Sequence, residues 1–62
     1  MGNNKYKILI VEDEAKLREV LCDYFISKGD QPFEAPNGVC ALELLQEYEF
    51  DAVLLDIMMP GL

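Results

Sequence analysis

Short apolar runs alternate along the chain with longer segments whose apolar residues recur every three or four positions. The runs that end at Val11, Ala35 and Leu55 are typical of strands, and the last of them, residues 52–55, is apolar enough to be buried on both faces of a parallel sheet. The segments 14–28 and 39–48 have the periodicity of amphipathic helices. The pattern therefore predicts a β-α-β-α-β chain of the α/β class.

The first predicted helix has a continuous apolar stripe, which we expect to be core: Leu17, Val20, Leu21, Tyr24 and Phe25. Asp13 and Glu14 are suited to cap its start, because acidic side chains favour the positive end of a helix. Glu14 and Arg18 have the i,i+4 spacing of an ion pair, and Gly29 is a typical helix stop. These features predict a helix that ends just before Gly29.

The second predicted helix, Val39 to Tyr48, is shorter and begins after the turn formed by residues 36–38. Asn37 precedes it and is a favourable N-cap residue. Its apolar face is expected to comprise Ala41, Leu42, Leu45 and Tyr48.

The three predicted strands are Lys5–Val11, Gln31–Ala35 and residues 52–55. Pro32 cannot donate a ladder hydrogen bond, so the second strand is expected at an edge of the sheet. Parallel crossovers are right-handed almost without exception. If the second crossover doubles back, the strand order is 2-1-3, the first strand is central, and the helices cover opposite faces.

Acidic residues follow two of these strands. Glu12 and Asp13 come directly after the first strand, and Asp56 comes directly after the third. Neighbouring parallel strands would bring the three carboxylates together at the edge where open α/β sheets bind ligands. Such a cluster is costly without a cation, and oxygen ligands favour Mg²⁺ or Mn²⁺. The alternative is that Asp56 only begins the turn completed by Pro60 and Gly61.

Length and composition limit the other possibilities. Sixty-two residues allow one small domain, and a net charge of −7 argues against nucleic acid or an anionic membrane as a direct partner. No apolar run approaches the roughly 20 residues that span a bilayer, and no secretory leader is evident, so we expect a cytoplasmic protein. Cys22 and Cys40 match no metal or redox motif and are expected to be free thiols that are buried or half-buried on the helices.

The chain resembles a response-regulator receiver domain of two-component signalling. Three stretches carry the resemblance: residues 8–13 (ILIVED), Asn37-Gly38 followed by Ala41-Leu42, and residues 53–61 (VLLDIMMPG). It covers residues 5–62, after a polar tail at residues 1–4. It implies a partial receiver domain, with three strands and two helices forming about half of a flavodoxin-like doubly wound sheet.

The resemblance also implies a function. Asp56 corresponds to the phosphoacceptor, Glu12 and Asp13 to the acidic pair that holds Mg²⁺, and Met58 to the residue whose backbone carbonyl completes the protein ligands. The partner would be a sensor histidine kinase or a phosphotransfer protein, and the domain would not be an enzyme. Glu12 departs from the more common Asp, by one methylene group.

Two residues of the family pattern have no counterpart in these 62 residues: the hydroxyl residue after the fourth strand and the lysine after the fifth. Lys5 and Lys7 lie at the far end of the first strand. The other basic residues are expected on the first helix, away from the site. Weak Mg²⁺ or Mn²⁺ binding and impaired phosphorylation are therefore expected.

Two alternative functions remain. One is a self-associating structural half-fold without activity, since the third strand would have one unpaired apolar edge, and Tyr24, Phe25 and Leu45 would be partly uncovered. Association is expected as a dimer through the third strand, or by exchange of segments between chains. The other is an aspartyl-nucleophile phosphatase, which is disfavoured because Met58 stands where those enzymes have a second acid.

Overall fold

The computed structural model describes residues 5–55. The elements follow the predicted order: β1 (Lys7–Val11), α1 (Ala15–Ser27), β2 (Gln31–Ala35), α2 (Gly38–Glu47) and β3 (Ala52–Leu55). β1 starts at Lys7 rather than at Lys5, and α2 lies one residue earlier than predicted. The α/β fold class is confirmed.

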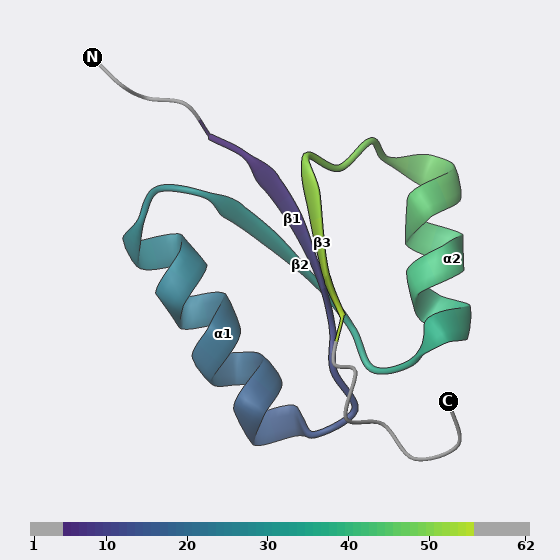
Figure 1. Ribbon diagram of the computed structural model, residues 1–62, viewed down its shortest axis with the longest axis horizontal. Helices are drawn as coiled ribbons and strands as arrows, with labels where there is room; N and C mark the ends of the chain where they lie inside the picture. Colours follow the sequence, from purple (N-terminus) through teal and green to yellow (C-terminus); the bar gives the residue numbers. More distant parts are fainter. Residues whose placement is uncertain (1–4, 56–62) are drawn as a thin grey trace.

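The sheet is parallel, and its strand order β2-β1-β3 is the predicted one. Val11, the last residue of β1, lies opposite Ala35 of β2 and Leu55 of β3. Figure 1 shows β1 between its two neighbours, with α1 and α2 on the two sides of the sheet. Pro32 lies on the edge strand β2, as its missing N–H requires.

Hydrogen bonds at the start of β1, one of them to the Asp51 side chain, fix its register with both neighbouring strands. The Lys7 N–H donates to Oδ2 of Asp51 at 2.8 Å, while the Asp51 N–H donates to the Lys7 carbonyl, also at 2.8 Å. On the other side, the Gln31 N–H donates to the Tyr6 carbonyl at 2.8 Å. Because both neighbouring strands enter the sheet in fixed register with β1, their carboxyl ends emerge together.

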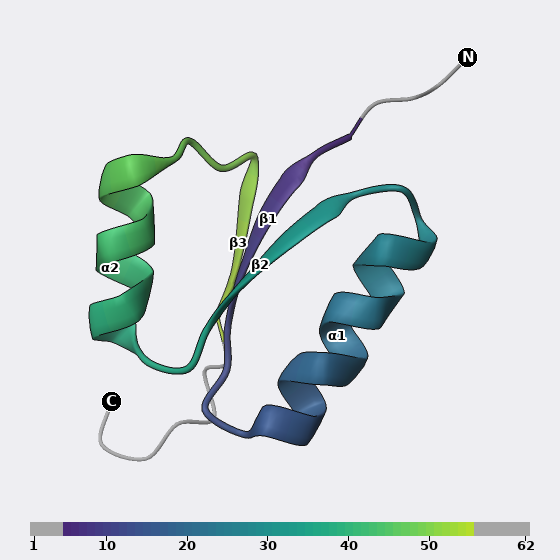
Figure 2. The same cartoon turned by 180° about the vertical axis from the view of Figure 1, so that it is seen from behind.

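The core has two halves, one on each face of β1. Leu9 and Val11 pack with Ala35 of β2 and Ala41 of α2, while Ile8 and Ile10 pack on the opposite face with residues of α1. The partly buried residues around these two clusters are Phe33, Cys40, Leu44 and Phe50 on the α2 side and Leu21 and Phe25 on the α1 side. Because successive side chains of β1 point to opposite faces, this strand packs against both helical layers. Figure 2 shows the two helices and the sheet from behind.

The predicted helical core faces are only half right. On α1, Leu21 and Phe25 are partly buried and Cys22 is buried, but Leu17, Val20 and Tyr24 are exposed. On α2, Ala41 is buried beside Cys40 and Leu44, whereas Leu42, Leu45 and Tyr48 are exposed. The exposure of Tyr24 and Leu45 agrees with the expectation that both would be partly uncovered. Both helices contact β1 and β2 and neither contacts β3, so the part of each stripe beyond β1 and β2 is uncovered.

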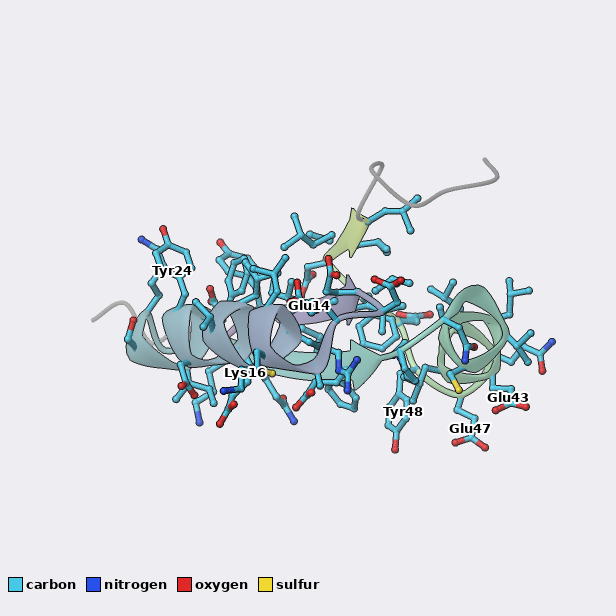
Figure 3. The ribbon with its side chains drawn as sticks, turned by 90° about the horizontal axis from the view of Figure 1, so that it is seen from below. Glu14, Lys16, Tyr24, Glu43, Glu47 and Tyr48 are labelled. Carbon is cyan, nitrogen blue, oxygen red and sulfur yellow. The ribbon has the colours of Figure 1, made fainter. Side chains whose placement is uncertain are left out.

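The expectation that residues 52–55 are buried on both faces is wrong for this structure. All four β3 residues are exposed, with Leu54 at 39% and Leu55 at 53%. Figure 3 shows β3 standing clear of both helices, with Tyr24 projecting from α1 on the side where β3 lies. Composition predicted the strand, but burial depends on neighbours that residues 5–55 do not supply.

Two of the three predicted helix-end features are present in the structure. The side chain of Asn37 accepts a hydrogen bond from the Cys40 N–H at 2.9 Å, and Gly29 ends α1 with a φ of 88°. Glu14 occupies the N-cap position of α1, but its side chain makes no capping hydrogen bond. Its own N–H is satisfied instead by the side chain of Glu12.

Candidate functional site

The candidate site begins where β1 ends. Glu12 is 3% exposed and continues the sheet by one hydrogen bond, from its N–H to the Ala35 carbonyl at 3.0 Å. Its Oε2 accepts a hydrogen bond from the Glu14 N–H at 3.0 Å, which closes a tight turn around Asp13. This turn carries the chain from β1 into α1 and leaves Asp13 exposed.

The structure brings part of the predicted acidic cluster to one edge of the sheet. Glu12 and Asp13 follow Val11, and Val11 is paired with Leu55, the residue that precedes Asp56. The predicted ligands Asp56 and Met58 lie outside the described residues. Within residues 5–55, no group of three His, Cys, Asp or Glu side chains is placed to hold a metal. The described part of the chain therefore supplies two of the predicted ligands.

Arg18 lies beside this turn, contrary to the expectation that all basic residues are distant from it. Its Nη1 donates to the backbone carbonyl of Glu12 at 2.7 Å, and its Nε donates to Oε1 of Glu34 on β2 at 3.0 Å. The predicted ion pair with Glu14 does not form; Glu34 takes that place. The sequence signal was misread because i,i+4 spacing favours a partner on the same helix, whereas Glu34 is sixteen residues away.

Two lysines are as distant from the acidic turn as expected. Lys7 begins β1 at the opposite end of the sheet, where its Nζ lies 5.6 Å from the centre of the Tyr48 ring. Lys28 follows the far end of α1, with its Nζ 5.2 Å from the centre of the Tyr24 ring. Both ammonium groups make cation–π contacts rather than facing the candidate site.

Cys22 lies behind the Arg18–Glu34 pair. Burial, together with a hydrogen bond to the neighbouring Glu34 carboxylate and the charge of that carboxylate, raises the pKa of its thiol from the ordinary value of 9.0 to about 11. Arg18 opposes this shift. Both cysteines are free, as predicted, with Cys22 buried and Cys40 half-buried. The thiol of Cys22 is thus kept neutral and protected on the inner side of α1.

The donor set at the turn suits a hard cation. Glu12 and Asp13 would offer carboxylate oxygens, and oxygen ligands favour Mg²⁺ or Mn²⁺ over zinc. No pocket is found over residues 5–55. Asp13 is exposed at this edge, while Glu12 is held by hydrogen bonds with Glu14, Arg18 and Ala35.

Comparison with known proteins identifies the family of the chain. A profile of the response regulator receiver domain matches residues 8–62. The chain is 43% identical over 56 residues to sporulation initiation phosphotransferase F of Bacillus subtilis (strain 168), covering 90% of this chain and 45% of that protein. It is 46% identical over 55 residues to the phosphate regulon transcriptional regulatory protein PhoB of Escherichia coli (strain K12), covering 89% of this chain and 24% of that protein.

The chain belongs to the response regulator receiver domain family. Receiver domains are signalling domains rather than enzymes, and β2-β1-β3 is the strand order with which their flavodoxin-like sheet begins. The chain spans less than half the length of these curated relatives. Within residues 5–55, no helix is long and apolar enough to cross a membrane.

The raised pKa of Cys22 predicts selective alkylation. At pH 8 its thiolate fraction is about a hundredfold lower than that of a thiol with a pKa of 9.0, and burial adds a steric barrier. Iodoacetamide should therefore modify Cys40 before Cys22, as read by peptide mass mapping. In urea the two should react at similar rates. Equal rates in the folded chain would contradict the burial and pKa of Cys22.

Proposed function

We propose that residues 5–62 form the phosphoacceptor part of a two-component response regulator, with Asp56 accepting a phosphoryl group and Glu12 and Asp13 binding a divalent cation. Asp56 and the backbone carbonyl of Met58 are the third and fourth proposed ligands. Residues 1–4 are a polar tail in this proposal. Family membership supports the assignment of roles, residue by residue, because the chain matches the family over residues 8–62.

One structural observation carries the proposal: the parallel pairing of β1 with β3. Val11 lies opposite Leu55, so the two strands end at the same edge, and the proposed acidic residues follow these strands directly in the sequence. That edge lies at the reversal of strand order, where doubly wound sheets bind their ligands. A slip of one residue in register would turn every side chain of β3 to the other face.

The proposed chemistry is a direct phosphoryl transfer. A carboxylate oxygen of Asp56 bonds to phosphorus while the bond between phosphorus and the donor breaks, and the donor leaves with the electron pair. An anionic nucleophile and an anionic phosphoryl group repel each other. A divalent cation, when bound, offsets this repulsion and the charge that develops on the phosphoryl oxygens. Glu12 and Asp13 would hold and orient that cation.

The donor that we propose is a phosphohistidine on a sensor histidine kinase or phosphotransfer protein, acting in the cytoplasm. One relative is named a sporulation initiation phosphotransferase and another a transcriptional regulatory protein, so the family is joined to more than one output. A direct contact of this part with nucleic acid or membrane is not proposed, because its net charge of −7 would oppose binding to anionic surfaces.

Phosphorylation of Asp56 is directly testable. With Mg²⁺ and acetyl phosphate, the chain should gain one phosphoryl group in its intact mass, and EDTA should prevent the gain. The expected rate is about 10²–10³-fold below that of an intact receiver, because these residues lack the family lysine that stabilises charge. A rate equal to an intact receiver's would contradict this expectation.

Substitutions should locate the modified residue. Asp56→Asn should abolish the mass gain, and Asp13→Ala should slow it by weakening cation binding. Asp23→Asn is the matched control, because Asp23 is an exposed carboxylate on α1, away from the carboxyl edge of the sheet. Phosphorylation that survives Asp56→Asn, or that depends on Asp23, would overturn the assignment.

A second candidate function, self-association, is favoured by the exposure of β3. Its outer edge has no partner strand within residues 5–55, and Val53, Leu54 and Leu55 are all exposed. An unpaired apolar edge is a template for another strand. We propose a two-fold dimer in which β3 pairs with its symmetry mate, giving the order 2-1-3-3′-1′-2′ with an antiparallel central pair. An exchange of segments would satisfy the same edge.

Sedimentation equilibrium tests this association. The 62-residue chain should be dimeric at high micromolar concentration, and Leu54→Lys should shift it toward monomer by placing a charge on the pairing edge. Leu42→Lys is the matched control, since Leu42 is at least as exposed but lies on α2. A folded wild-type monomer at that concentration, or equal effects of the two lysines, would contradict the proposal.

A further inference from the structure

We infer that Arg18 is a positioning residue for the acidic turn at residues 12–14, and that it sets the cation affinity of this edge; the second part of the inference rests on the proposed function. Arg18 does not itself bind the cation or the phosphoryl group. It acts by holding the Glu12 peptide in one orientation, and it anchors that peptide to the neighbouring strand β2.

The contacts of Arg18 enclose the turn. Its Nη1 donates to the Glu12 carbonyl at 2.7 Å, and its own backbone N–H donates to the Glu14 carbonyl at 2.9 Å. The Glu14 N–H in turn donates to Oε2 of Glu12 at 3.0 Å. Glu12, Glu14 and Arg18 therefore form a closed ring of hydrogen bonds, with Asp13 carried on the turn between them.

A second set of contacts fixes this ring to the sheet. The Glu12 N–H donates to the Ala35 carbonyl at 3.0 Å, and Nε of Arg18 donates to Glu34, the residue before Ala35, at 3.0 Å. The Arg18 side chain is only 17% exposed. A planar guanidinium can serve a carbonyl and a carboxylate at once because its donors are held in a rigid fork. The turn is thereby tied to β2 at two adjacent residues.

A surface ion pair between Arg18 and Glu34 alone would not explain all of the contacts that Arg18 makes. The Glu34 side chain is 49% exposed, and exposed ion pairs contribute about 0–1 kcal/mol. The shorter contact of Arg18 is the one to the Glu12 carbonyl, which an ion pair with Glu34 does not require. The residues that hold metal ligands in place commonly act through such contacts, at one remove from the ion.

If Arg18 acted only through its charge, its removal would change the cation affinity in the opposite direction from the change expected if it positions the turn. A guanidinium next to the turn repels a cation, so removing its charge should strengthen cation binding if charge alone matters. If Arg18 acts by holding the turn, its removal should weaken binding despite the loss of a repulsive charge. Lys16 provides the control, because it is exposed on the first turn of α1 and its side chain makes no ion pair or hydrogen bond with another of residues 5–55.

The experiment compares Arg18→Gln with Lys16→Gln by following free Mn²⁺ in an electron paramagnetic resonance titration of the chain. Each variant removes one positive charge from the start of α1. Arg18→Gln should raise the Mn²⁺ dissociation constant about tenfold, as other changes behind a metal ligand do. Lys16→Gln should leave it unchanged or lower it. Equal or tighter binding by Arg18→Gln would overturn the inference.

Arg18→Lys is a second test variant, which keeps the positive charge and most of the aliphatic side chain. It therefore perturbs the packing of the fold less than Arg18→Gln does. One ammonium cannot reproduce the fork of the guanidinium, and we expect binding weaker than that of the wild type. Wild-type affinity in Arg18→Lys would show that charge and packing suffice, and would contradict the positioning role.

A readout without metal separates this inference from the proposed function. The exchange rate of the Glu14 amide, measured by NMR with no divalent cation, reports on its hydrogen bond to Glu12. Arg18→Gln should speed this exchange, and Lys16→Gln should not. If the wild type fails to bind Mn²⁺, the proposed cation site is wrong, while the exchange rates still decide the positioning role: unchanged exchange in Arg18→Gln would overturn it.

Discussion

The structure depends on one strand, β1, being paired in parallel on both sides. Leu9 and Ile10 are fully buried there on opposite faces, and complete burial of such side chains contributes about 1.5–3 kcal/mol each. One face supports α2 and the other supports α1. The same pairing aligns the carboxyl ends of β1 and β3, so the feature that forms the core also fixes the edge from which Glu12 and Asp13 leave β1. Core and candidate site therefore share one cause.

Much of this fold was predictable because each local pattern agrees with the topology. Pro32 required an edge, Gly29 permitted the left-handed end of α1, and the apolar run of β1 required burial on both faces. Burial elsewhere was less predictable. Val20 and Leu42 have the periodicity of core residues, yet both are exposed, because periodicity identifies an apolar face and not what covers it. The exposure of β3 has the same origin.

The candidate site was predictable in its residue types and less so in its supporting contacts. Glu12 and Asp13 were identified because acids directly after a buried strand occupy the binding edge of a parallel sheet. Arg18 was assigned to an ion pair within α1, whereas it bridges Glu12 and Glu34. That error has a physical basis: contacts between residues distant in sequence depend on how α1 lies across β2, which side-chain spacing along one helix does not determine. The burial of the Cys22 thiol was expected, but its contact with Glu34 was missed for the same reason.

The central claim is that the ends of β1 and β3 form one cation-binding edge. Paramagnetic broadening by Mn²⁺ in a two-dimensional NMR spectrum of the chain tests it most directly, because broadening falls off steeply with distance from the ion. The account predicts that signals from Glu12, Asp13 and Leu55 broaden first, while those from Lys7 and Gln31, at the opposite end of the sheet, stay sharp. Broadening that is strongest around Glu43 and Glu47 of α2, or uniform along the chain, would contradict it.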